Sequence, residues 1–191
     1  MQSEASSQPS QQNLVSARAV IESLQLAELD NFFRVACLQG QPVQIDSVID
    51  KDDPQAAVIY PIILADRLEV IVKLPKQPLR YYKTTIAQSE VERLLEDLQQ
   101  KIIKPYTLLE TQSLSKQVYD WLIRPAEADL AKSQVKTLVF VLDGSLRNIP
   151  MAALYDGQQY LVQKYAIALT PGLQLLAPKS LERRQIKSLT A

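Results

Sequence analysis

The stretch TLVFVL at residues 137–142 decides the fold of this chain, and the turn signal Asp143-Gly144 follows it directly. Among the strands that the sequence predicts, it alone is apolar on both faces. A central parallel strand that is covered on both sides has this pattern. The stretch therefore predicts an α/β domain built around a buried strand.

Two apolar segments upstream of this strand predict a β-hairpin. The run AAVIYPIIL at residues 56–64 is continuous, and LEVIVKL at residues 68–74 alternates so that its apolar residues share one face. Pro61 lacks an N–H donor, so we expect the first strand at a sheet edge or at a bulge rather than in the sheet centre. Residues 82–87 predict a third strand that extends the hairpin.

Apolar residues at three- and four-residue spacing predict helices on both sides of the hairpin. Residues 14–33 have the spacing of an amphipathic helix or helix pair. Ser89 and Glu92 form an S-x-x-E capping box, and a buried stripe over residues 91–102 follows it.

A third apolar stripe covers residues 114–122. It predicts a helix that ends near Arg124, because Pro125 biases its predecessor away from helical geometry. We expect a short helix over residues 125–131 and a strand over residues 165–169.

The composition excludes several classes of protein. Hydrophobic residues make up 47% and charged residues 22%, as in an ordinary folded domain. Lys plus Arg equals Asp plus Glu at 21 each, so no net charge attracts nucleic acid or an anionic membrane. The chain contains no histidine and one cysteine, Cys37, which excludes a Cys/His zinc cluster and an intramolecular disulfide. We expect no cofactor and no metal, and Cys37 as a small apolar residue.

The first 13 residues are rich in Ser and Gln, and they lack the basic and apolar regions of a signal peptide. We expect a disordered tail over residues 1–13. No later stretch approaches the 18 or more apolar residues of a membrane span. The sequence therefore predicts a cytoplasmic protein without a membrane contact.

Residues 137–176 closely resemble the beginning of the CHAT domain, a caspase-like domain often found downstream of tetratricopeptide repeats and abundant in cyanobacteria. Their sequence is TLVFVLDGSLRNIPMAALYDGQQYLVQKYAIALTPGLQLL, in which DGSLRNIPMAALYDG is the most specific part. The segments ESLQLAELDNFF, AAVIYPIIL with LEVIVKLP, and VYDWLIRP also resemble the region that leads into this domain.

The resemblance implies a caspase-like peptidase architecture, with a mostly parallel sheet, flanking helices and a His/Cys dyad on loops. In such a dyad the thiolate is the nucleophile and the imidazole activates it. In the family both residues lie C-terminal to the matched region, so we expect a chain truncated before them. The expected organisation is a tail at 1–13, a helical and hairpin region at 14–135 that packs on the core, and an incomplete CHAT domain at 136–191.

Two functional hypotheses remain open. The first is a truncated CHAT-domain protein that is not an enzyme by itself. Its partner would be a complementary CHAT half or a tetratricopeptide-repeat protein, and the unfinished sheet could also drive self-association. The alternative is a non-catalytic protein-protein interaction module on the same scaffold.

Few residues qualify as site candidates. Arg147 follows the predicted central strand, where α/β sheets place groups that contact ligands, and it is the one candidate for a ligand or partner contact. A structural salt bridge or carbonyl cap is the competing role. A Ser145-Lys164 catalytic pair and a cation site in the acidic loop at residues 50–53 are the less favoured interpretations of these segments.

Overall fold

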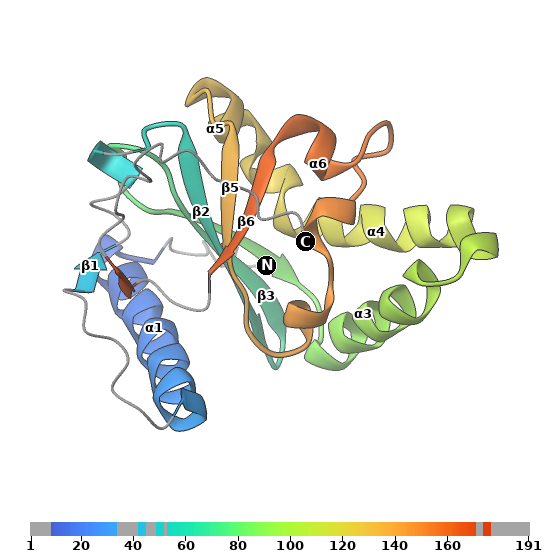
Figure 1. The fold of residues 1–191 in the computed structure, drawn as a ribbon, viewed down its shortest axis with the longest axis horizontal. Coiled ribbons are helices and arrows are strands. Elements are labelled where there is room, and N and C mark those ends of the chain that lie inside the picture. Colours follow the sequence, from blue (N-terminus) through green and yellow to red (C-terminus); the bar gives the residue numbers. More distant parts are fainter. Residues whose placement is uncertain (1–8, 34–41, 45–48, 52, 171–173, 177–191) are drawn as a thin grey trace, which may run out of the picture.

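The computed structural model describes residues 9–33, 42–44, 49–51, 53–170 and 174–176, and a five-stranded sheet forms its centre (Figure 1). The strand order is β4-β3-β2-β5-β6. These strands are β2 (Ala56–Leu64), β3 (Arg67–Lys73), β4 (Arg80–Thr85), β5 (Thr137–Val141) and β6 (Ala166–Thr170). A separate pair of short strands, β1 (Pro42–Gln44) and β7 (Gln174–Leu176), is antiparallel.

The sheet is mixed. β4, β3 and β2 are antiparallel neighbours, whereas β2, β5 and β6 run parallel. The predicted hairpin and the predicted central strand therefore belong to one sheet, which confirms the α/β fold class with flanking helices.

The described ranges contain several helical segments, including a short helical stretch at residues 49–51. The others are α1 (Gln11–Phe33), α3 (Gln88–Ile102), η1 (Pro105–Thr107), α4 (Leu108–Leu122), η2 (Arg124–Ala126), α5 (Glu127–Lys132), η3 (Gly144–Asn148), η4 (Met151–Ala153) and α6 (Leu161–Lys164). The three predicted helical stripes, over residues 14–33, 91–102 and 114–122, correspond to α1, α3 and α4.

β5 is buried on both faces, as its sequence predicts. Leu138 and Phe140 are fully buried in the larger core cluster, which contains residues of α3 and α4. Val141 is buried in a smaller cluster with Leu14 of α1. Figure 1 shows α1 on one side of the sheet and α3 and α4 on the other. The alternation of side chains along β5 thus joins two cores across one sheet.

The prediction that the strand containing Pro61 lies at a sheet edge is wrong, although Pro61 itself lies where the strand has no β5 neighbour. β2 has neighbours on both sides, but its pairing with β5 ends at Ile59. The Gln55 carbonyl oxygen accepts from β5-side amides, and alternate residues of a strand face the same neighbour. The Pro61 nitrogen therefore points to the β5 side, beyond the last pair, where no N–H is needed.

The predicted capping box at Ser89 and Glu92 is wrong. Helix α3 begins at Gln88 after the N-cap residue Ala87, which has no side-chain cap, so Ser89 lies inside the first turn. Glu92 instead accepts a 2.8 Å hydrogen bond from the Gln88 side chain. The helix begins two residues too early for the serine to act as a cap.

The predicted tail is too long at its C-terminal end. Helix α1 begins at Gln11, within the range predicted as a tail. Residues 1–8 lie outside the described residues, and so does Cys37, which was predicted as a small apolar residue. The Gln11 side chain donates to the Leu79 carbonyl at 2.8 Å and accepts from the Leu79 amide at 3.0 Å. This pair of hydrogen bonds fixes the first turn of α1 to the segment before β4.

We predict that Leu138→Ala lowers the free energy of unfolding by about 2–5 kcal/mol, because it leaves a cavity beneath α3 and α4. Urea denaturation followed by circular dichroism measures this loss. Val162→Ala, on α6 with a residue exposure of 57%, is the control and should change stability by less than about 0.5 kcal/mol. Equal effects of the two substitutions would contradict the central role of β5.

Candidate functional site

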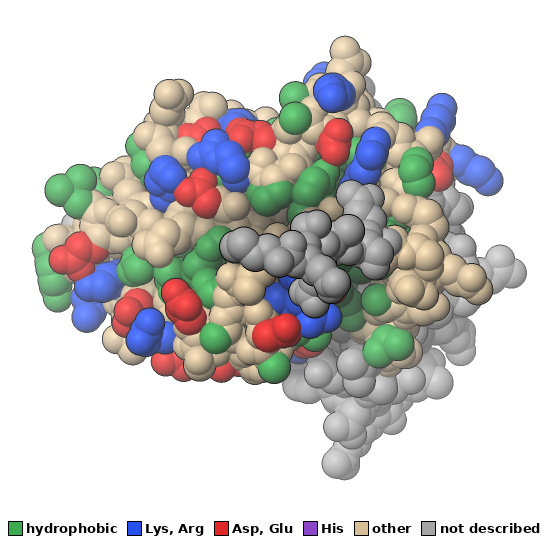
Figure 2. Space-filling view, turned by 180° about the vertical axis from the view of Figure 1, so that it is seen from behind, with side chains coloured by type: hydrophobic (Ala, Val, Ile, Leu, Met, Phe, Trp, Pro, Cys, Tyr) green, Lys and Arg blue, Asp and Glu red, His purple; other side chains and the backbone are tan. Residues whose placement is uncertain are grey.

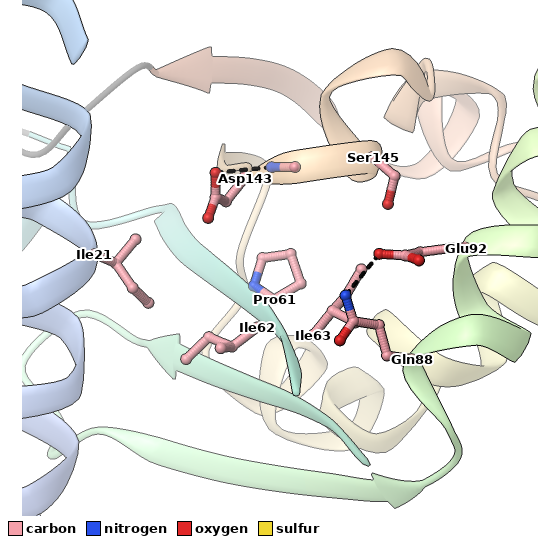
Figure 3. Close-up of a pocket in the computed structure, with 9 residues that line it drawn as sticks. Ile21, Pro61, Ile62, Ile63, Gln88, Glu92, Asp143 and Ser145 are labelled. Atoms are coloured by element: carbon pink, nitrogen blue, oxygen red, sulfur yellow. Dashed lines mark hydrogen bonds between the residues drawn. The ribbon is translucent and has the colours of Figure 1, made fainter. Parts of the chain in front are cut away.

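A pocket of about 190 Å³ lies beyond the carboxyl ends of β2 and β5 (Figure 3). β2 contributes the apolar residues 61–63 near its carboxyl end, and the loop after β5 contributes residues 143–145. Gln88 and Glu92 of α3 and Ile21 of α1 complete the lining. Ligands of α/β sheets bind at this edge, so the pocket is the candidate site.

The loop after β5 has a conformation that explains its Asp-Gly sequence. Gly144 has φ +53°, in the left-handed region that favours glycine. The Asp143 carboxylate accepts a 2.7 Å hydrogen bond from the Gly144 amide and thereby starts helix η3. The loop therefore turns sharply and directs Ser145 back toward α3.

The Ser145 hydroxyl is buried and has no hydrogen-bond partner within the described residues. Figure 3 shows it directed toward the side of the pocket where Glu92 lies. Lys164, the base in the alternative Ser-Lys interpretation, bonds to other residues altogether. Lys164 therefore does not serve as a base that activates this hydroxyl. Within the described structure, the hydroxyl is a buried polar group without a hydrogen-bond partner.

Arg147 lies at a second hollow, of about 240 Å³, between the ends of β5 and β6. Its Nε donates to the Leu142 carbonyl at 3.1 Å, and its Nη2 lies 3.5 Å from the Asp143 carboxylate. These contacts are the carbonyl cap and salt bridge that compete with ligand binding. A ligand or partner contact by Arg147 stays a prediction.

A cluster of charged and phenolic groups around Lys164 connects α4, α5 and the loop before α6. The Lys164 ammonium contacts Glu127 at 2.6 Å, the Tyr119 hydroxyl at 3.2 Å and Asp156 at 3.3 Å. Arg124 adds a 3.0 Å bond to Glu127 and a 2.6 Å bond to the Asp156 carbonyl. The cluster fixes the loop around the Tyr155 and Tyr160 bridge onto the helices.

The sequence did not reveal this cluster, because its members are separated by up to 45 positions. The helix end predicted before Pro125 lies next to the cluster, but it does not indicate that these segments meet. At the pocket, Glu92 had been noted only as part of the predicted capping box, and Gln88 had not been noted.

The cluster shifts the protonation of its members. Burial raises the pKa of Glu127, but hydrogen bonds from Lys164, Tyr119 and Arg124 outweigh it and leave that pKa below its ordinary value of 4.5. Burial likewise raises the pKa of Asp156, and the amides of Gln159 and Gln158 with Lys164 bring it below 3.8. Burial and the bond to Glu127 raise the pKa of Tyr119 to about 12.

The acidic loop at residues 50–53 has a structural partner. Asp50 accepts hydrogen bonds from the Lys73 ammonium at 3.0 and 3.2 Å and from the Lys76 amide at 2.7 Å. The Lys73 side chain is 8% exposed, so this bond compensates its burial.

In the described part of the chain, no three His, Cys, Asp or Glu residues are grouped as metal ligands would be. No described helix is both long and apolar enough to cross a bilayer.

The fold and the pocket define an α/β protein with its candidate site at the carboxyl edge of a mixed sheet. The family model of the CHAT domain matches residues 112–190, from the middle of α4 through β5 and β6. The match covers less than half of the chain and is consistent with a CHAT domain in this region, a family related to caspase-like peptidases.

Other comparisons add little. No curated protein matches the chain. A solved structure titled "PilM-PilN type IV pilus biogenesis complex" is similar at 13% identity and a TM-score of 0.30. The match covers 66% of this chain and 41% of that one. A likeness at this score carries no argument about function.

We predict that Ser145→Ala leaves the free energy of unfolding unchanged or raises it by up to about 1 kcal/mol, because it removes a buried hydroxyl without a partner. Chemical denaturation measures the change. The matched control is Ser115→Ala, whose buried hydroxyl donates to the Ala153 carbonyl at 2.5 Å. This control should lose about 1–3 kcal/mol. A comparable loss at Ser145 would show that its hydroxyl has a partner.

The Lys164 cluster predicts a loss of stability in acid. Because the folded-state pKa values of Glu127 and Asp156 lie below the unfolded values, their stabilisation is complete above the unfolded pKa and is lost as pH falls through the folded pKa. Denaturation curves should show the decline beginning near pH 4.5 and continuing below 3.8.

Lys164→Met should flatten this decline, since both carboxylates lose the cation that favours their charged form. The control is Lys132→Met, at an exposed position of α5, which should leave the pH dependence unchanged. An unchanged acid decline in Lys164→Met would assign it to other carboxylates.

Proposed function

We propose that this chain is a CHAT-type, caspase-like scaffold without peptidase activity by itself, and that a second polypeptide supplies the His/Cys dyad. The observation that carries the proposal is the absence of histidine from all 191 residues. A cysteine nucleophile of this class needs an imidazole to activate it and to protonate the leaving amine. The site at the carboxyl edge of the sheet supports the proposal, because its one hydroxyl has no base.

The outer edge of β6 supports the proposal that a second polypeptide binds to this chain. Within the described residues β6 pairs with β5 alone, so its other side can accept a strand. The Ala166 amide donates to the Lys136 carbonyl at 2.8 Å, so Ala166 and alternate residues face β5. Ile167 and Leu169 therefore direct their backbone N–H groups to the open side. The partner is a complementary CHAT half or a tetratricopeptide-repeat protein, in the cytoplasm, where a single thiol stays reduced.

The second candidate function is a non-catalytic protein-protein interaction module. A specific observation favours it, since large apolar side chains are exposed where α3 and α4 meet. In this function the scaffold binds a partner through its surface, and the pocket has no chemical role.

The test is a peptidase assay with and without a recombinant polypeptide that carries the histidine and cysteine segments of a CHAT domain. We expect the chain alone to cleave none of a pool of fluorogenic peptides, and the mixture to cleave some of them. Cleavage by the chain alone that Ser145→Ala abolishes would overturn the proposal. Binding without cleavage would favour the interaction module.

A strand-edge variant tests where the partner binds. Leu169→Pro removes an N–H on the open side of β6 without touching the pairing with β5, so it should weaken partner binding at least about 10-fold. Isothermal calorimetry measures the affinity. Leu169→Ala keeps the N–H and is the control for the lost side chain. Equal binding by the two variants would exclude this edge.

A further inference from the structure

The tip of the helix pair α3 and α4 exposes four large apolar side chains within seven residues. Ile103 is 79% exposed, Tyr106 81%, Leu108 57% and Leu109 80%, and we call these four residues the apolar tip. Figure 2 shows hydrophobic side chains gathered at the left end of the molecule, where this helix pair ends. Scattered apolar residues on a surface are ordinary, but a contiguous group marks a contact site.

The backbone of the tip is held so that these side chains stay outside. The Thr107 hydroxyl donates to the carbonyls of Lys101 and Lys104, each at 2.8 Å. An ion pair between Lys101 and Glu110 links the end of α3 to the start of α4. A surface fixed in this way loses little conformational entropy when it binds.

The tip also projects away from the rest of the fold. Figure 1 shows α3 and α4 extending together beyond the sheet, on the side opposite α1. Their buried residues, such as Leu95, Leu98 and Val118, lie in the core cluster. Within this helix pair, the large exposed apolar residues are thus confined to the end that the sheet does not reach.

We propose that the apolar tip is the contact of a two-fold symmetric dimer of this chain. At roughly 170 Å² for a large exposed side chain, the four exposed fractions amount to about 500 Å² per copy, or about 1,000 Å² for two copies. This is the lower limit for a specific interface, so we expect a weak dimer.

The charges around the tip fit a second copy. Lys101, Lys104 and Glu110 border it, so each copy offers both signs at the rim. In a two-fold contact, residue i meets residue j and j meets i, which allows Lys104 of each copy to approach Glu110 of the other. An anionic membrane or a strongly charged protein would need a rim of one sign.

Sedimentation velocity of the purified chain between about 1 and 200 µM tests the proposal. The wild-type chain should pass from monomer to dimer as its concentration rises. The double variant Y106S/L109E should raise the dimer Kd at least about 30-fold, because it places a charge in the contact. A wild-type chain that is monomeric throughout, or a double variant that dimerises equally well, would overturn the proposal.

Two controls separate this contact from others. V162E introduces a charge at an exposed apolar position of α6, outside the tip, and should leave the dimer unchanged. Leu169→Pro blocks the β6 edge of the proposed function and should also leave it unchanged. If Leu169→Pro abolishes the dimer and Y106S/L109E does not, self-association runs through the sheet edge and the tip proposal fails. Circular dichroism melts of each variant report folding independently.

Discussion

The burial of β5 on both faces is the constraint on which the rest of the structure depends. Phe140 faces the core beneath α3 and α4, and Val141 faces the core beneath α1. A strand with two apolar faces is stable only when both are covered, so the helices must lie on opposite sides of the sheet. β5 also joins the antiparallel hairpin to the parallel part, because β2 and β6 pair with its two edges.

The candidate site is a consequence of where this pairing stops. β2 continues past Ile59, while β5 ends at Val141 and the chain turns at Gly144, so the two strands separate at the carboxyl edge. The space between them becomes the pocket, with Ser145 on one side and the first turn of α3 on another. Next to the amino end of β6, the Lys164 cluster secures the segment between β5 and β6 to the helices. Backbone geometry therefore shapes the carboxyl edge, and side-chain charges hold the segment that leads into β6.

Much of the fold could be predicted from local patterns. The hairpin strands, β5 and the stripes of α3 and α4 were confirmed, because the periodicity of apolar residues reflects the surface that each element buries. Errors arose where one backbone hydrogen bond decided the outcome. Ser89 lies two residues after the N-cap position of α3, and Pro61 fits a central strand because its nitrogen points beyond the last residue pair of β2 with β5. The candidate site was less predictable: Arg147 and, as a less favoured candidate, Ser145 had been named, but the pocket residues of α1, β2 and α3 had not been brought together with them.

The sequence by itself determined that the chain contains no histidine, that it forms an α/β fold around residues 137–142, and that its DGSLRNIPMAALYDG segment resembles the CHAT domain. These properties follow from composition and from local spacing. Only the tertiary structure decided that the hairpin pairs with β5, that Lys164 meets Glu127 and Asp156, and that the α3–α4 tip is left exposed. Such contacts join residues distant in the chain, and their energy depends on burial and geometry that no local pattern contains.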